Sequence, residues 1–237
     1  MKKVFLTAEW KNLIMANYEV ESSVLYPYLP AKTELDLWEG KCYISLVGFM
    51  FQHVKLRGFS IPFHTRFPEV NLRFYVRYRS AEGARRGVVF INEIVPKPAI
   101  TWVANSIYKE NYITLPMKNL LSVDRSGLKV SYSWKRKAWN TIAVAAGSTA
   151  VALKPGSKEE FITEHFWGYA AHGKSRTVEY QVEHARWNIF PVKEYDVKCD
   201  FGNVYGRSFE FLNELKPASV FLAEGSAIKV LDRSIIS

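Results

Sequence analysis

Apolar and polar side chains alternate with a period of two in residues 70–79. One set, which is mostly polar, consists of Asn71, Arg73, Tyr75, Arg77 and Arg79, and the apolar set consists of Leu72, Phe74, Val76 and Tyr78. Successive side chains of a strand point to opposite faces, so this alternation predicts a strand with one apolar and one polar face. Residues 127–136 and 177–187 repeat the pattern.

Short turn signals separate the predicted strands. They are Glu39-Gly40, Glu82-Gly83, Ser126-Gly127, His172-Gly173 and Glu224-Gly225. Aromatic residues, which favour strands, make up 15% of the chain. Many strands joined by tight turns indicate a mainly β protein, built as an antiparallel barrel or sandwich rather than as a parallel α/β sheet. No linker or repeat is visible, so we expect residues 1–237 to form a single domain.

Three helices are expected between the strands. One begins at Ser22 or Ser23 and ends near Tyr28. A second begins at Pro98, because proline suits the first position of a helix, and it has an apolar face made of Ile100, Val103, Ala104 and Ile107. A third begins at Ser157, which has capping-box spacing with Glu160.

The composition limits the compartment and the partners. The formal net charge of +9 permits an acidic partner, although a basic solvated surface is the preferred explanation. The first apolar run stops at Glu9, too early for a signal peptide, and no stretch is long enough to span a membrane. Cys42 and Cys199 match no metal or disulfide spacing, so we expect reduced thiols in the cytoplasm. Whether the chain forms homo-oligomers stays open.

The common catalytic motifs are absent from the sequence. It contains no glycine-rich phosphate loop, no dinucleotide fingerprint, no Gly-x-Ser-x-Gly and no His-Glu-x-x-His. The five histidines show no ligand pairing at helical spacing. We therefore expect neither a metal nor a cofactor.

Glu69, Asn71 and Arg73 share one face of the predicted strand at 67–76. An acid, an amide and a guanidinium in a row could orient a polar ligand, because arginine binds a carboxylate through two parallel hydrogen bonds. The alternative is a solvent-facing row of cross-strand charge pairs.

Two further clusters are candidates for a functional site. Lys97 lies between two prolines at a predicted helix start, where the helix dipole and burial would disfavour its ammonium form. A neutral lysine amine can form an imine with a carbonyl, whereas an exposed loop lysine would have no such role. His184 and Trp187 close another strand, where His184 could donate a hydrogen bond to a ligand or simply bond to the backbone.

These segments resemble the bacterial YqjF-like family, the domain of unknown function 2071. The resemblance rests on the 67–76 string, on His184-x-x-Trp187, and on Leu29-Pro30, Leu35-Asp36 and Gly40-Lys41-Cys42-Tyr43. The family resembles acetoacetate decarboxylase more distantly, which implies a closed antiparallel double-meander barrel around a cavity. That enzyme forms an imine on a lysine with a second lysine beside it. The resemblance matches Lys97 to the first lysine, Pro98 to the second, and Glu69 to a pocket glutamate.

Three functions follow from the residues and the resemblance. In the first, the cavity binds a small carbonyl or carboxylate metabolite without covalent chemistry, and Glu69, Asn71 and Arg73 orient it. Glu93, His184 and Trp187 are further ligand-binding candidates. In the second, Lys97 and Glu69 are catalytic in an imine-forming lyase that acts on a keto acid or an aldehyde. The third and least favoured is a nucleic-acid or interaction module with a basic stripe of Arg73, Arg77, Arg79, Arg85 and Arg86.

Overall fold

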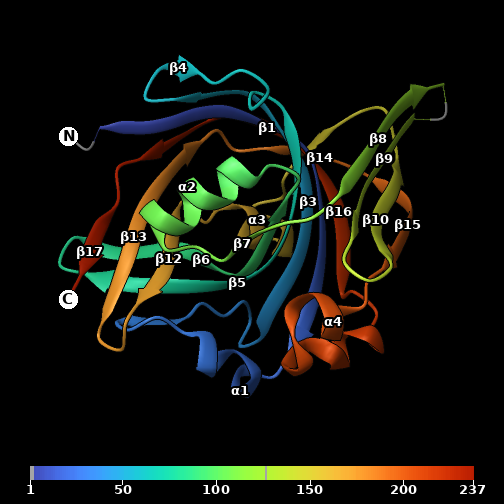
Figure 1. Ribbon diagram of the computed structural model, residues 1–237. Helices are drawn as coiled ribbons and strands as arrows, with labels where there is room; N and C mark the ends of the chain where they lie inside the picture. Colours follow the sequence, from blue (N-terminus) through green and yellow to red (C-terminus); the bar gives the residue numbers. More distant parts are fainter. Residues whose placement is uncertain (1–2, 126) are drawn as a thin grey trace.

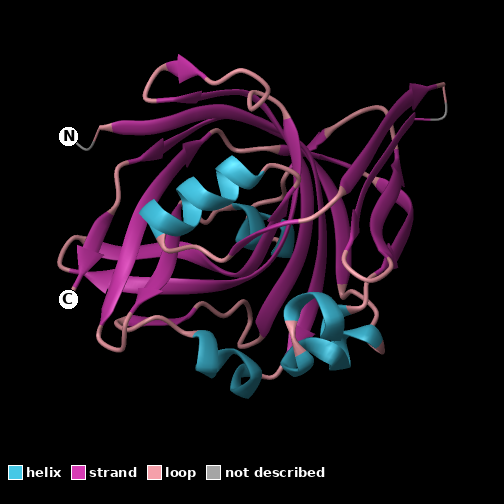
Figure 2. Ribbon diagram, in the orientation of Figure 1, coloured by secondary structure: helices cyan, strands magenta, loops and turns pink. Residues whose placement is uncertain are grey.

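The computed structural model describes residues 3–125 and 127–237, and strands dominate it (Figure 2). The expectation of a mainly β protein is thereby confirmed. The large sheet contains β1 (Val4–Val20), β2 (Thr33–Leu35), β3 (Cys42–Leu56), β4 (Phe59–Ser60), β5 (Phe67–Ser80), β6 (Gly83–Val95), β7 (Tyr112–Thr114), β11 (Val151–Ala152), β12 (Trp167–His172), β13 (Arg176–His184), β14 (Asn188–Phe190), β16 (Ser219–Leu231) and β17 (Ser234–Ile236). The small sheet contains β8 (Met117–Asp124), β9 (Gly127–Lys135), β10 (Trp139–Ala146) and β15 (Val192–Lys198).

Strand pairing in the large sheet leads from β16 through β1, β3, β5, β6, β12 and β13, and β13 pairs in turn with β16. The sheet is not antiparallel throughout, which corrects the expectation from the sequence. Strand β6 pairs in parallel with both β7 and β12. The chain between β6 and β12 includes α2, most of the small sheet and α3, and a connection of that length allows the chain to re-enter the sheet in the same direction.

The helices and 3-10 turns are α1 (Ser22–Leu25), η1 (Tyr26–Tyr28), α2 (Pro98–Tyr108), α3 (Lys158–Thr163), α4 (Phe201–Tyr205) and η2 (Arg207–Asn213). The three helices expected from the sequence are confirmed. The Ser157 side chain caps α3 by accepting a hydrogen bond from the Glu160 backbone N–H at 3.2 Å. Figure 1 shows α2 inside the curve of the large sheet. The sequence did not predict α4 or η2, because segments this short carry too little periodicity.

One of the predicted turns is wrong. Gly225 lies inside β16 and pairs with Lys11 of β1. Its φ of +79° and the closeness of the Trp10 carbonyl explain the glycine, because a Cβ here would collide with that oxygen. The turn predicted at Ser126-Gly127 includes Ser126, which lies outside the described residues. The other three glycine pairs lie at turns, as expected.

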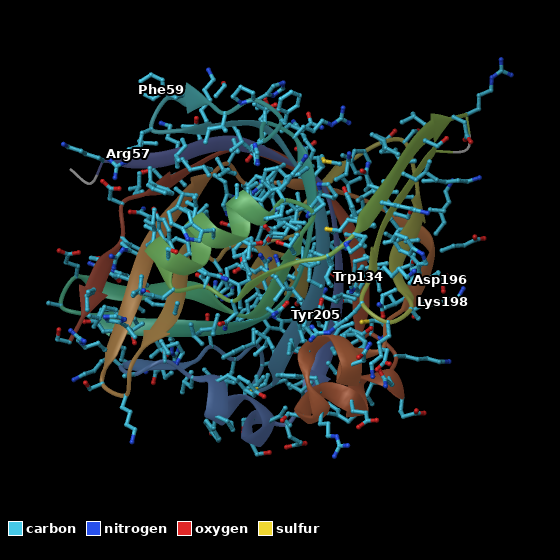
Figure 3. The ribbon with its side chains drawn as sticks, viewed as in Figure 1. Arg57, Phe59, Trp134, Asp196, Lys198 and Tyr205 are labelled. Atoms are coloured by element: carbon cyan, nitrogen blue, oxygen red, sulfur yellow. The ribbon has the colours of Figure 1, made fainter. Side chains whose placement is uncertain are left out.

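The two faces of β5 pack against different surroundings. Leu72, Phe74 and Val76 belong to a hydrophobic cluster that includes Tyr132 and Trp134 of the small sheet. Trp134 is fully buried and lies where the small sheet meets the rest of the molecule (Figure 3). Tyr75, on the opposite face, belongs to a second cluster rich in aromatic residues. The fold therefore gives β5 a tightly packed face and a face turned to the second cluster, where the candidate site lies.

Candidate functional site

A cavity of about 220 Å³ lies within the second cluster. Aromatic and aliphatic side chains form most of its wall, including Trp10, Phe49, Phe51, Trp187 and the α2 residues Ile100, Val103 and Ala104. The predicted apolar face of α2 thus covers the cavity. The wall also includes Ile61 and Ala99, which are exposed, so the cavity reaches solvent near them.

A row of polar side chains from β5 enters this apolar cavity. Glu69, Asn71 and Arg73 all line it, and their residues are 2%, 1% and 8% exposed. The side-chain Nδ2 of Asn71 donates a hydrogen bond to Glu69 Oε1 at 2.9 Å. The polar face of β5 is therefore buried in this stretch rather than turned to solvent.

Neighbouring strands add more polar groups to this row. Asn71 pairs across the sheet with Glu93 of β6, and Glu93 pairs with Tyr112 of β7. The Tyr112 hydroxyl donates a hydrogen bond to Glu69 Oε2 at 2.9 Å. Strand pairing therefore brings one acid each from β5 and β6 together with a tyrosine from β7.

A third buried acid, Glu110, lies just before β7 and also lines the cavity. The hydroxyl of Tyr180, on β13, donates a hydrogen bond to Glu110 Oε1 at 2.6 Å. Three glutamates from different parts of the sequence thus share one cavity. Below, Glu69, Glu93 and Glu110 are called the glutamate cluster.

Burial shifts the pKa values of the whole glutamate cluster upward, because it penalises the charged form of a carboxyl group. It raises the pKa of Glu69 to about 7, against the hydrogen bonds of Asn71 and Tyr112 and the charge of Arg73. It raises the pKa of Glu110 to about 8, against the hydrogen bond of Tyr180. Burial, followed by the charges of Glu110 and Glu69, raises the pKa of Glu93 well above its usual range.

The guanidinium of Arg73 faces these acids without a close partner of opposite charge. Its only hydrogen bond in the described chain is a long one from Nη2 to the Met15 sulfur, at 3.9 Å, and its Nε has no partner there. Its Cζ lies 6.0 Å from the ring centre of Tyr75. A buried guanidinium in this state retains hydrogen-bond donors for a ligand.

His184 and Trp187 form part of the aromatic wall. Their rings stack with centres 4.3 Å apart and planes at 22°, and Trp10 meets Trp187 edge-on. The Nδ1 of His184 donates to the Ala185 carbonyl oxygen at 2.8 Å, and Trp187 Nε1 donates to Ser226 Oγ at 2.9 Å. Burial lowers the pKa of His184, which keeps the ring neutral near pH 7.

The structure does not bring Lys97 into this site. Lys97 is the partly buried residue that precedes α2, and the described residues that line the cavity include no lysine. The other sequence-predicted site residues, namely Glu69, Asn71, Arg73, Glu93, His184 and Trp187, all line the cavity.

The basic stripe proposed for nucleic-acid binding does not exist as an exposed row of unpaired arginines. Arg73 is in the cavity. The other four make ion pairs, since Arg77 and Arg79 bind Glu34, Arg85 binds Glu82 and Glu179, and Arg86 binds Asp36. The sequence pattern could not show this, because the acidic partners lie on other strands and loops.

Sequence reasoning missed Glu110, Tyr112, Tyr180 and His165 as cavity residues. Glu110 and Tyr112 are two residues apart, which is the spacing of one strand face. That signal could not be used without knowing that β7 pairs in parallel with β6. His165 is buried and hydrogen-bonds through Nε2 to Asp36 at 3.1 Å, and burial lowers its pKa to about 4.

Within residues 3–125 and 127–237, no group of three or more His, Cys, Asp or Glu side chains is arranged to hold a metal ion. No helix in that part of the chain is long and apolar enough to cross a membrane. Cys42 and Cys199 are free thiols.

The family profile of DUF2071, described as an uncharacterized conserved protein, matches residues 7–227. The chain belongs to this family. It is 26% identical to YqjF of Bacillus subtilis strain 168 over 183 aligned residues. The alignment covers 75% of this chain and 72% of YqjF.

Solved structures with a similar fold include an acetoacetate decarboxylase-like enzyme and an enzyme of enduracididine biosynthesis. An acetoacetate decarboxylase-like enzyme from Sphingomonas wittichii RW1 has a TM-score of 0.67 at 11% identity, covering 99% of this chain and 94% of that one. The enduracididine biosynthesis enzyme MppR in complex with pyruvate has a TM-score of 0.68 at 12% identity. The match covers 100% of this chain and 91% of MppR. At these identities the likeness establishes the fold.

Proposed function

We propose that this protein binds a small, largely apolar carboxylate metabolite in the cavity, without a covalent bond to the protein. The observation that carries the proposal is Arg73, a buried guanidinium in the cavity wall that makes no ion pair within the described chain. A buried charge is costly unless a counter-charge meets it, and a carboxylate is the group that a guanidinium binds best.

The rest of the cavity supports the same class of ligand. Its wall is mostly aromatic and aliphatic, which suits the body of a small organic molecule. Asn71 Oδ1 and Glu93 Oε2 are buried without a hydrogen-bond partner in the described chain, so polar atoms remain to orient a hydroxyl or carbonyl group. MppR, whose fold is similar, was solved with pyruvate, which is itself a small carboxylate.

The proposal needs no lysine. Imine formation by Lys97 stays a prediction. The described residues that line the cavity include no lysine whose amine could form an imine with a ligand there.

We also propose that residues 1–237 form one domain with the double-meander barrel of the acetoacetate decarboxylase-like proteins. In support, β16 near the end of the chain pairs with β1 at its start and with β13.

Calorimetric titration tests the binding proposal. The probes are 3-phenylpropanoate and the alcohol 3-phenylpropanol, which has the same body without the carboxylate. We expect the carboxylate to bind and the alcohol to bind at least tenfold more weakly. We expect Arg73→Gln to lower the affinity for 3-phenylpropanoate by about 10- to 100-fold, which is the usual loss when a hydrogen bond to a charged group is removed.

Arg79→Gln is the matched control, because Arg79 is on the same strand but exposed. It should leave the affinity unchanged. Equal binding of acid and alcohol, or equal binding by the wild type and Arg73→Gln, would contradict the proposal.

A further inference from the structure

The cavity holds more acidic than basic groups. The glutamate cluster contributes three carboxyl groups and Arg73 one guanidinium, all in one largely apolar wall. If every group were ionised, the cluster would carry two uncompensated negative charges in a medium that solvates charge poorly. The glutamate cluster must therefore retain protons near neutral pH, and the charge of Arg73 fixes how many.

Glu69 is the acid of the cluster that lies on the same strand as Arg73. It lies on the same face of β5 as Arg73, and the positive charge of the guanidinium lowers its pKa. That pKa, about 7, lies below the value of about 8 for Glu110. A carboxylate ligand bound to Arg73 would cancel this stabilisation and place a second negative charge in the same cavity.

We propose that the cavity takes up a monocarboxylate together with one proton, so that Glu69 is a neutral carboxylic acid in the liganded protein. The inference rests on the proposed function, since it requires the ligand carboxylate to bind Arg73. One guanidinium then faces one carboxylate, and the buried site stays electrically neutral.

The other groups around Glu69 leave it as the acceptor of the proton. Burial lowers the pKa of His165 to about 4 and lowers that of His184, and the pKa values of Tyr112 and Tyr180 lie well above their usual range, so none of these groups takes up a proton near pH 8. The pKa of Glu110, about 8, lies above that of Glu69, about 7, and burial raises the pKa of Glu93 well above its usual range. The titratable and charged groups that face the site from every side are Arg73 on β5, Glu93 on β6, Tyr108 on α2, Glu110 and Tyr112 at β7, Tyr180 and His184 on β13, His165 before β12, and His64 near the opening.

This charge balance also defines the ligand class. A second carboxylate on the ligand would find no second cation among the described cavity residues and would face the glutamate cluster. Monocarboxylates should therefore be preferred over dicarboxylates that have the same body. A ligand with an added ammonium group should bind without proton uptake, because the ammonium group could pair with ionised Glu69.

The test measures the number of protons bound with 3-phenylpropanoate. The heat of binding is recorded at pH 7.5, where Glu69 is mostly ionised and Glu110 mostly protonated, in imidazole and in Tris buffer, whose ionisation enthalpies differ, and the difference gives the proton uptake. We expect uptake of about one proton per ligand and an affinity that falls about tenfold per pH unit above pH 7. Benzylsuccinate, which adds a second carboxylate, should bind at least tenfold more weakly.

Glu69→Gln identifies the group that takes the proton. Glutamine mimics the neutral acid, so this variant should still bind 3-phenylpropanoate, with no proton uptake and little dependence on pH. Glu34→Gln, at an exposed carboxyl group outside the cavity, should retain the uptake.

The outcomes separate this inference from the proposed function. Binding that depends on Arg73 but occurs without proton uptake, or with uptake that survives Glu69→Gln, overturns the inference and leaves the proposed function intact. Failure of wild-type protein to bind 3-phenylpropanoate at all refutes both. Thermal unfolding of each variant shows whether it is folded, and a Glu69→Asp variant that still takes up the proton would support the assignment if Glu69→Gln fails to fold.

Discussion

The two faces of β5 differ in what surrounds them, because one packs against other side chains and the other lines the cavity. On one face, Leu72 and Phe74 are fully buried in a cluster that joins the two sheets. On the other, Glu69 and Arg73 are almost equally buried, yet they line a cavity, and Arg73 makes no ion pair within the described chain. The comparison shows that burial alone does not distinguish a stabilising side chain from a functional one. What distinguishes them is whether neighbours fill the space and satisfy the polar atoms.

The largest effect on stability is expected from the packed face. Phe74→Ala should lower the free energy of unfolding by about 3 to 5 kcal/mol, because it leaves a void that the neighbouring strands cannot fill. Urea unfolding followed by circular dichroism measures it. Leu120→Ala on β8, where the side chain is exposed, is the control and should change little. A loss below about 1 kcal/mol for Phe74→Ala would show that this face is not tightly packed.

The cavity face should make stability depend on pH in a direction opposite to that of an ordinary ion-paired acid. The pKa values of Glu69 and Glu110, about 7 and about 8, lie above the ordinary value of 4.5, so the folded protein binds more protons than the unfolded chain. The stability that Glu69 and Glu110 contribute is fully present below about pH 4.5 and is lost as the pH rises through 7 and 8. Each such proton changes the free energy of unfolding by about 1.4 kcal/mol per pH unit inside that window.

Urea midpoints between pH 5 and pH 9 test this expectation. The double variant Glu69→Gln, Glu110→Gln should flatten the decline. Glu34→Gln is the control and should leave the decline unchanged, because hydrogen bonds from Arg79 and Arg77 lower the pKa of Glu34, so that it is ionised in both states across this pH range. Stability that is constant from pH 5 to pH 9 in the wild type would mean that the glutamate cluster is solvated.

A smaller effect, of opposite sign to that of Phe74→Ala, is expected at Arg73. Replacing a buried charge that lacks an ion-pair partner by an apolar side chain of similar length removes a desolvation cost. Arg73→Met should therefore raise the free energy of unfolding by about 1 to 2 kcal/mol while it abolishes carboxylate binding. Chemical denaturation without ligand provides the measurement, and a destabilised Arg73→Met protein would indicate that the arginine is structural.

Period-two alternation predicted β5, β9 and β13 because each strand has an apolar set of side chains that the fold buries. It could not tell whether the polar set of β5 meets solvent or a cavity, since that depends on which strands close over it. Glu93 and Tyr112 meet through a parallel pairing that local sequence does not encode, and Glu110 meets Tyr180 across the cavity. Lys97 illustrates the converse, because a favourable local setting before a helix did not place it in the cavity wall.

The smallest effect is expected at the exposed end of β5. Arg79 shares the carboxylate of Glu34 with Arg77, and its side chain is 69% exposed. Such surface pairs contribute little, so Arg79→Gln should change the free energy of unfolding by less than about 0.5 kcal/mol. A loss above about 1 kcal/mol in urea unfolding would show that the paired arginines at this end of β5 are part of the packed structure.

A crystal structure of the protein with bound 3-phenylpropanoate tests the central claim most directly. We predict that the ligand carboxylate lies about 3 Å from the guanidinium nitrogens of Arg73 and that its phenyl ring lies against the aromatic wall beside Trp187. A ligand bound outside the cavity, or inside it with its carboxylate turned away from Arg73, would contradict the account.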